Sequence, residues 1–298
     1  MIGDGGAMAR DLGLVLVGSA PAGVPGWFWW TSVSVWGALI GSFLNVCIAR
    51  WPMELSVVAP RSHCPRCQRP ITWYENVPVL SWVALGGRCR GCRLRISVQY
   101  PAVEVAIALT WLAAFALSDS RFTGLRVAVF VTILAGVAIT DARYYLIPDG
   151  FTVFGLTWVC ALSFIGVFVG ESSGFALPYD ALIGACVGAG AISIVGWLGE
   201  VVLKKEAMGF GDVTLMAVVG AALGPARTLL TIFLGAAVGA VLFAVVVLPA
   251  TWVRARRAGV EFEPPLVPFG VFLAPAAVGA LLWGNRLIAW YLARIGPT

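Results

Sequence analysis

Two aspartates stand at the ends of apolar segments, where a membrane protein rarely carries charge. Asp141 follows the run RVAVFVTILAGVAIT, and Asp212 lies in MGFGDVTLMAVVG, directly before another apolar run. A carboxylate at the edge of the hydrocarbon layer is costly unless it is paired, hydrated or functional. Because the two segments can end at the same membrane face, the sequence predicts a paired-aspartate site.

Such a pair has a well-defined chemistry. Two carboxylates in close proximity cannot both ionise easily, so they share one proton. The ionised member can act as a general base on water, while the protonated member polarises a scissile carbonyl and later helps to protonate the leaving amine. Asp212 could instead cap the short apolar segment that follows it. Carboxylates in membrane spans also carry protons and ions, so a transporter relay is an alternative to peptide hydrolysis.

A second group of chemically active side chains is cysteine. Four of the seven cysteines form two C-x2-C pairs, Cys64 with Cys67 and Cys89 with Cys92, separated by 21 residues. This spacing is typical of zinc ribbons, so the sequence predicts a structural zinc ion held by four thiolates with no open position. Four reduced thiols in a loop that is held by packing alone are the alternative.

The composition indicates what must position these groups. The chain has 298 residues, of which 60% are hydrophobic and only 12% charged, which is typical of a polytopic membrane protein. A membrane span needs about 20 apolar residues. Eight candidate spans are 27–49, 101–118, 123–141, 151–170, 179–203, 213–224, 227–252 and 267–292. The sixth is too short to cross alone and is predicted to pair with the Gly-rich turn before it or to lie inside the bundle.

The predicted fold is therefore an all-α polytopic membrane protein of about eight transmembrane helices, with a small zinc-ribbon-like loop domain between the first and second. The predicted divisions are an N-terminal leader segment (1–26), the first transmembrane helix (27–49), a cytoplasmic four-Cys loop domain (50–99) and a transmembrane core (100–298). With alternating spans, this arrangement places 14 Lys and Arg in cytoplasmic segments and 6 on the other side. The positive-inside rule favours that orientation, which puts Asp141 and Asp212 at the cytoplasmic face.

Several motifs, in order along nearly the whole chain, resemble those of the bacterial type IV prepilin peptidases, an intramembrane aspartic peptidase family. They are GSFLNVCIARWP (41–52), PRSHCPRC (60–67), ITWYENVPVLSWVALGGRCRGC (71–92), YPAVE (100–104), DARYYLIPD (141–149), GFGDVTLMA (209–217) and PFGVFLA (268–274). Two positions depart from the family pattern: Thr214 replaces a frequent lysine, and Val271 replaces a proline. Neither removes a carboxylate, although both could shift substrate fit.

The resemblance implies an enzyme of the bacterial inner (plasma) membrane with its active site at the cytoplasmic face. It implies removal of the leader of type IV prepilins or pseudopilins after a Gly, with Asp141 and Asp212 as the catalytic pair. It also implies N-methylation of the new N-terminal residue, often Phe, with S-adenosylmethionine, because the four-Cys loop accompanies the methylating members. The implied partners are these substrates and the lipid bilayer, and no nucleic acid is expected.

The methyl-donor site is less clearly marked in the sequence. No G-x-G-x-x-G loop follows a strand, so no dinucleotide-type fold is expected. Glu75, with Asn76, is the candidate, because Glu75 is the only carboxylate in the matched loop motif. Glu75 could equally anchor the loop through arginines. Three other functions stay open: a peptidase that uses the Cys loop only for docking, a proton-coupled transporter with the aspartates as its relay, and a zinc-dependent assembly scaffold without chemistry.

Overall fold

The computed structural model describes residues 20–171, 174–204, 208–259, 261–262 and 267–295. Within these ranges the chain is almost entirely helical, with two isolated β-bridges and no extended strand. The chain divides into two compact units, residues 1–132 and 133–298. Residues 1–19 of the predicted leader segment lie outside the described residues. The predicted divisions at 27–49, 50–99 and 100–298 stay a prediction.

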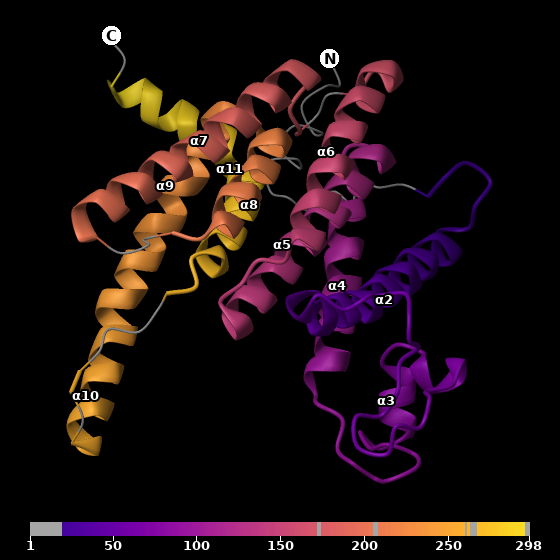
Figure 1. Ribbon diagram of the computed structural model, residues 1–298. Helices are drawn as coiled ribbons and strands as arrows, with labels where there is room; N and C mark the ends of the chain where they lie inside the picture. Colours follow the sequence, from indigo (N-terminus) through magenta and orange to yellow (C-terminus); the bar gives the residue numbers. More distant parts are fainter. Residues whose placement is uncertain (1–19, 172–173, 205–207, 260, 263–266, 296–298) are drawn as a thin grey trace. The chain divides into compact units, whose positions relative to one another are not determined.

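The helices carry the labels of Figure 1. They are α2 (Gly26–Arg50), η1 (Trp51–Met53), η2 (Trp73–Asn76), α3 (Leu80–Ala84), α4 (Gln99–Leu117), α5 (Arg121–Tyr144), α6 (Asp149–Val169), α7 (Pro178–Leu203), α8 (Phe210–Leu223), α9 (Pro225–Leu242), η3 (Phe243–Val247), α10 (Leu248–Ala258) and α11 (Gly270–Ile295).

The predicted fold class is confirmed. Seven helical segments in the described part of the chain are long and apolar enough to cross a membrane, so this is an integral membrane protein. One of them is the continuous segment Pro225–Ala258, in which α9 and α10 join through the π-helical turn η3. It extends beyond the predicted span 227–252. The α8 helix is apolar but has only 14 residues, as expected for the segment that is too short to cross alone.

In the first unit, α2 and α4 pack closely against each other. Gly37 and Gly41 face α4, and a Cβ atom on either would lie 2.8 Å from a backbone Cα atom there, that of Ala108 or that of Glu104 respectively. Small residues four positions apart let two helix backbones approach. This contact therefore fixes the backbone of Glu104 against α2.

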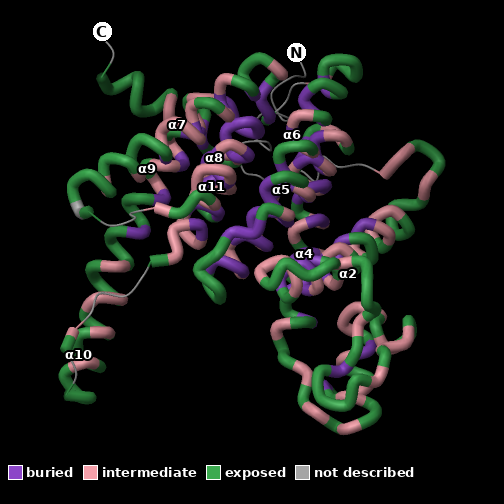
Figure 2. The backbone as a smooth tube through the Cα atoms, in the orientation of Figure 1, coloured by how far each residue is buried: buried purple, intermediate pink, exposed green. Residues whose placement is uncertain are grey.

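In the second unit, α8 is the buried centre. It packs against α6, α7, α9 and α11, and its residues from Val218 to Leu223 are all buried (Figure 2). A helix that is apolar on every side is stable only when other helices cover it. The prediction that this segment lies inside the bundle is confirmed. Its N-terminal turn carries Asp212, so the same burial that orders α8 also positions that carboxylate.

The contact between α7 and α8 depends on glycine. A Cβ atom on Gly184 would overlap the carbonyl oxygen of Gly220, and a Cβ atom on Gly220 would overlap that of Gly184. These positions lie opposite each other, so neither helix can yield locally without separating from the other. The α7 helix thereby holds α8, and through it the Asp212 turn, by direct backbone contact.

We therefore expect Gly184→Ala to lower the free energy of unfolding by about 1–3 kcal/mol, the usual cost of an overpacked core. The measurement is the thermal unfolding midpoint of the detergent-solubilised protein. Gly190→Ala is the matched control, because Gly190 lies in the same helix and a Cβ atom added there would meet no atom within 4 Å. Equal midpoints for the two variants would contradict the packing argument.

Candidate active site and metal centre

Asp141 lies in the last turn of α5 and is only 5% exposed. Its Oδ2 atom accepts a hydrogen bond of 3.1 Å from the backbone N–H of Val271. Val271 is in the first turn of α11, where backbone N–H groups have no partner within the helix. The positive end of a helix dipole also favours a nearby carboxylate. The start of α11 thus orients the Asp141 side chain.

Gly270, the residue before Val271, must be a glycine because there is no room for a side chain at this position. A Cβ atom there would lie 2.9 Å from Oδ2 of Asp141 and 3.0 Å from Cδ1 of Ile147. Any side chain would displace the carboxylate or the isoleucine. The PFGV sequence at 268–271 therefore places a glycine against the carboxylate and a free N–H group next to it.

Asp212 lies in the first turn of α8, after the N-cap residue Gly209, whose carbonyl accepts its backbone N–H at 3.1 Å. A Cβ atom on Gly211 would lie 2.8 Å from Cβ of Ile147. The second glycine of GFGD therefore also leaves no room for a side chain. Among the described residues, Oδ1 of Asp212 is buried and has no hydrogen-bond partner. An unpaired buried carboxylate oxygen is costly, which is typical of a site that acts on a ligand.

The two aspartates come together in the second unit. Asp212 directly follows Gly211, and Asp141 lies against Gly270, and both glycines lie against the same residue, Ile147. Ile147 is buried and follows α5. It lies against Gly211 in the first turn of α8 and against Gly270 at the start of α11, so it links the end of α5 to these two turns. The sequence predicts the pair but not the roles of Ile147 and of the α11 turn. The only sequence signal for that turn is the PFGV segment, which belongs to a matched motif but has no role that its residues alone reveal.

If Asp141 is catalytic, as the family resemblance implies, Gly270→Ala should lower prepilin cleavage, because the added methyl group must displace the Asp141 carboxylate or Ile147. A misplacement of about 1 Å in a catalytic group can cost on the order of 100-fold in rate. The measurement is the initial rate of leader removal by purified protein. Gly279→Ala, in the same helix with no atom within 4 Å of its Cβ position, should keep the unmodified rate. Equal rates for both variants would remove Gly270 from the site.

The four-Cys loop folds as two similar turns. The N–H of Cys64 bonds to the carbonyl of Arg69, and the N–H of Cys89 bonds to that of Leu94. Each turn is closed by one β-bridge, His63 with Pro70 and Arg88 with Arg95. In each, the residue after the second cysteine has a positive φ, 55° at Gln68 and 59° at Arg93. The two turns present their cysteines to a common point.

The cysteine geometry fits a tetrahedral metal ion. All four Sγ atoms lie within 4.8 Å of one another, with 3.7 Å between Cys64 and Cys92 and 3.9 Å between Cys67 and Cys89. Zn–S bonds of about 2.3 Å in a tetrahedron require sulfurs about 3.8 Å apart. These four residues could therefore hold a zinc ion.

Glu75, one of the two predicted methyl-donor residues, lies in η2 with its carboxylate already engaged. It bonds to Arg69 at 3.0 Å and to the N–H of Thr72 at 3.2 Å, and Arg90 approaches to 3.6 Å. Burial raises its pKa, but the hydrogen bonds from Thr72 and the Arg69 charge outweigh that effect and hold the pKa below its ordinary value. These contacts are those of a loop anchor, the alternative role for Glu75.

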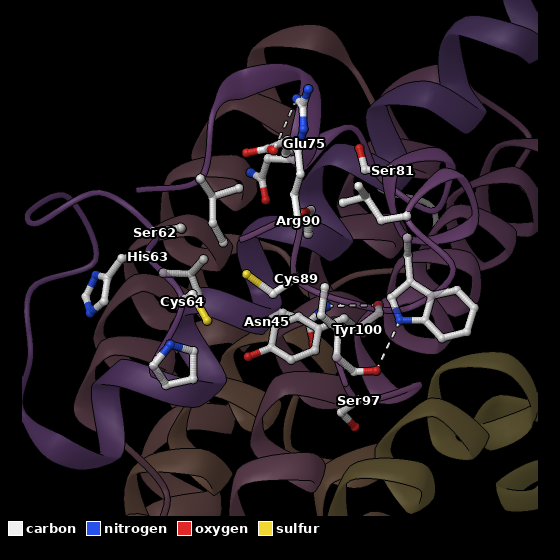
Figure 3. Close-up of a pocket in the computed structure, with 18 of the residues that line it drawn as sticks. Asn45, Ser62, His63, Cys64, Glu75, Ser81, Cys89, Arg90, Ser97 and Tyr100 are labelled. Atoms are coloured by element: carbon white, nitrogen blue, oxygen red, sulfur yellow. Dashed lines mark hydrogen bonds and ion pairs between the residues drawn. The ribbon is translucent and has the colours of Figure 1, made fainter. Parts of the chain in front are cut away.

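Glu75 and Asn76 nevertheless line a cavity of about 500 Å³ in the first unit (Figure 3). Its walls come from the C-terminal half of α2, the two cysteine turns, the η2–α3 segment and the start of α4. Drug-sized ligands occupy cavities of about 300–1,000 Å³, so this one is large enough for a small molecule.

Comparison with known proteins covers both units. Residues 35–117 match the bacterial peptidase A24 N-terminal domain, and residues 128–244 match the type IV leader peptidase family. The chain is 33% identical over 298 residues to the prepilin leader peptidase/N-methyltransferase of Aeromonas salmonicida (strain A449), covering 92% of this chain and 97% of the relative. It is 36% identical over 264 residues to the protein of that name from Myxococcus xanthus (strain DK1622), covering 85% and 74%. For the one from Stutzerimonas stutzeri, identity is 36% over 286 residues, covering 87% and 92%. No solved structure matches the chain significantly.

Proposed function

This chain belongs to the type IV leader peptidase family, and we propose that it is an intramembrane aspartic endopeptidase and N-methyltransferase. It removes the leader of type IV prepilins or pseudopilins after a Gly. It then methylates the new N-terminal residue with S-adenosylmethionine. Its relatives carry both activities in their names, and the shared length includes both units.

Asp141 and Asp212 are the proposed catalytic pair. The ionised member takes a proton from a water molecule, whose oxygen attacks the scissile carbonyl carbon. The protonated member donates a hydrogen bond to the carbonyl oxygen and then a proton to the leaving amine. The pair titrates as a unit, so the proton belongs to both carboxylates. The Val271 N–H group and the small residues Gly211 and Gly270 keep the two side chains in position.

The observation that carries this proposal is the convergence of the two aspartates. They come from segments far apart in the sequence, yet Gly270, which lies against the Asp141 carboxylate, and Gly211, which precedes Asp212, both lie against Ile147. The distribution of Lys and Arg supports a cytoplasmic position for this site in the bacterial plasma membrane. The positively charged leader of a prepilin is expected on the cytoplasmic side by the same rule.

The methyl-transfer activity is assigned to the first unit. The four cysteines hold a structural zinc ion that fixes the two turns, and Glu75 with Asn76 belongs to the cavity wall beside them. S-adenosylmethionine supplies an electrophilic methyl group, whose transfer to the amine leaves S-adenosylhomocysteine and releases one proton. An N-terminal amine has a pKa near ~8, so it needs little assistance to lose that proton.

The test is mass spectrometry of a purified prepilin after incubation with this protein in detergent, with and without S-adenosylmethionine. We expect loss of the leader in both reactions and one added methyl group only when the donor is present. Cleavage without methylation would leave a peptidase whose Cys loop serves for docking. Intact prepilin in both reactions, repeated with several pilins, would contradict the proposal and favour the transporter relay.

A further inference from the structure

The cavity in the first unit contains a second carboxylate, Glu104, to which the sequence assigns no role. Glu104 lies in the second turn of α4 and is only 7% exposed. Its backbone is fixed by the close contact with Gly41 of α2. Its Oε2 atom accepts a hydrogen bond of 2.7 Å from the backbone N–H of Val79. The side chain is therefore held in one place at the cavity wall.

The residue that donates to Glu104 has a strained backbone. Val79 has φ 60° and ψ −50°, and the N–H of Leu80 bonds to the carbonyl of Pro78 at 2.6 Å. This is a γ-turn of the rare positive-φ type, which is unfavourable for a β-branched residue. Strained backbone of this kind persists where the surrounding structure enforces it, often at functional sites. Here the strain places one N–H group on a buried carboxylate.

The two carboxylates of the cavity differ in their partners. Glu75 is paired with Arg69 and Arg90, whereas no cation forms an ion pair with Glu104 in the described part of the chain. A buried carboxylate without a cation is costly. A positively charged group in the cavity would remove that cost. Glu104 is therefore the carboxylate that is available to a cationic ligand.

The charges and the aromatic ring in the rest of the cavity lining indicate which kind of cationic ligand fits. Four arginines line the same cavity, Arg50, Arg69, Arg90 and Arg95. They would repel a Lys- or Arg-rich peptide, such as a positively charged leader. Arg69 and Arg90 already pair with Glu75, and Arg50 donates to the carbonyls of Ser56 and Pro60. Arg95 therefore remains for a ligand carboxylate in the described part of the chain, and a ligand that carries a carboxylate as well as a positive centre fits Arg95 and Glu104. The cavity also offers the aromatic ring of Tyr100 beside the Asn45 side chain (Figure 3), which suits a flat base.

We propose that this cavity binds S-adenosylmethionine, with Glu104 as the counter-ion of its positively charged sulfonium. The inference rests on the proposed methyl-transfer function and assigns a site to it. S-adenosylmethionine carries a sulfonium, a carboxylate and an adenine ring, which are the three features that the lining accommodates. Glu75 then acts as the anchor of the cavity wall, and Glu104 as the group that contacts the ligand.

The assignment also explains the place of the four cysteines. Cys64 and Cys89, one from each cysteine turn, line the cavity, and both are visible there in Figure 3. A metal ion that ties the two turns together would hold two walls of the cavity at a fixed separation. Zinc thereby supports donor binding without contacting the methyl group.

The first experiment measures equilibrium binding to the full-length protein in detergent. The probes are S-adenosylmethionine labelled in its methyl group and S-adenosylhomocysteine, whose sulfur is neutral. We expect Glu104→Gln, which keeps an oxygen acceptor for Val79, to weaken S-adenosylmethionine binding by about tenfold or more, as for loss of a charged partner. Binding of S-adenosylhomocysteine should remain nearly unchanged. Glu54→Gln, at an exposed glutamate outside the cavity, is the matched control and should bind both ligands normally.

The possible outcomes distinguish failure of the binding-site assignment from failure of the proposed methyl-transfer function. If the unmodified protein methylates a pilin but Glu104→Gln binds the donor as tightly as Glu54→Gln does, the site assignment fails and the function stands. An equal loss for both ligands would overturn the sulfonium pairing. If the unmodified protein neither binds the donor nor methylates, the function and the site fail together.

A second measurement needs no variant. Ultraviolet irradiation of the unmodified protein with labelled S-adenosylmethionine should attach the label within the lining, between Ser42 and Glu104. Peptide mapping by mass spectrometry locates it. Label confined to the second unit would overturn the proposal even if Glu104→Gln failed to fold.

Discussion

Asp141→Asn and Asp212→Asn should each lower the rate of leader removal by about 10²–10⁴-fold, the usual contribution of a general acid or base. Asparagine keeps the size of the side chain and can still accept the Val271 N–H, so the local structure should persist. It cannot take a proton from water or share one with the other carboxylate. The measurement is the initial rate of cleavage of a purified prepilin, followed by mass spectrometry.

A control and a double variant sharpen this test. Asp149 is exposed and is the first residue of α6, so Asp149→Asn should cleave at the unmodified rate. The double variant of Asp141 and Asp212 should be little slower than either single one, because residues that act as a unit are not additive. Full activity of either single variant would remove that aspartate from the mechanism. Strictly multiplicative losses would argue against a shared-proton pair.

Loss of the metal should have the second large effect, and it should fall on methylation. Cys64→Ser or Cys92→Ser breaks the four-sulfur cluster. Structural zinc in small domains contributes about 10–16 kcal/mol to folding, so the two cysteine turns should separate. Because Cys64 and Cys89 line the cavity, donor binding and methylation should both be lost. Leader removal should continue, because both aspartates belong to the second unit, which has its own core.

The measurement is the zinc content per chain by elemental analysis, together with cleavage and methylation of one pilin. Cys186→Ser, at an exposed cysteine of α7 outside the cluster, should keep zinc and both activities. Absence of zinc from the unmodified protein would contradict the metal assignment. Full methylation by a zinc-free Cys64→Ser protein would separate the metal from the donor cavity.

Much of this protein follows from local sequence. Long apolar runs determine the membrane-spanning helices, because each helix satisfies its own backbone hydrogen bonds in lipid. The 14-residue α8 is recognisable in the sequence as too short to span for the same reason. The C-x2-C spacing predicts the cysteine cluster, because each turn is a local structure. The two aspartates stand out because charge at the end of an apolar run is costly.

The sequence leaves the partners of these groups open. Nothing in PFGV indicates by itself that Val271 donates to Asp141, since the two residues are far apart in the chain. Ile147 is an ordinary apolar residue in sequence and becomes the contact between two glycines only in the fold. Glu75 is the sequence candidate for the methyl-donor site because it stands in a conspicuous motif, yet its carboxylate is engaged by two arginines.

Glu104 shows most clearly what the sequence does not reveal. In the sequence it is the last residue of the matched segment YPAVE, near the start of an apolar helix, without a spacing rule that assigns it a role. Only the packing of α4 on Gly41 and the strained turn at Val79 leave it buried beside a cavity and without a cation. The sequence alone determined the fold class and the cysteine cluster and predicted the aspartate pair, because local patterns encode helices, turns and the cost of charge. The tertiary structure alone decided which polar groups are paired and which are available, because that depends on long-range packing.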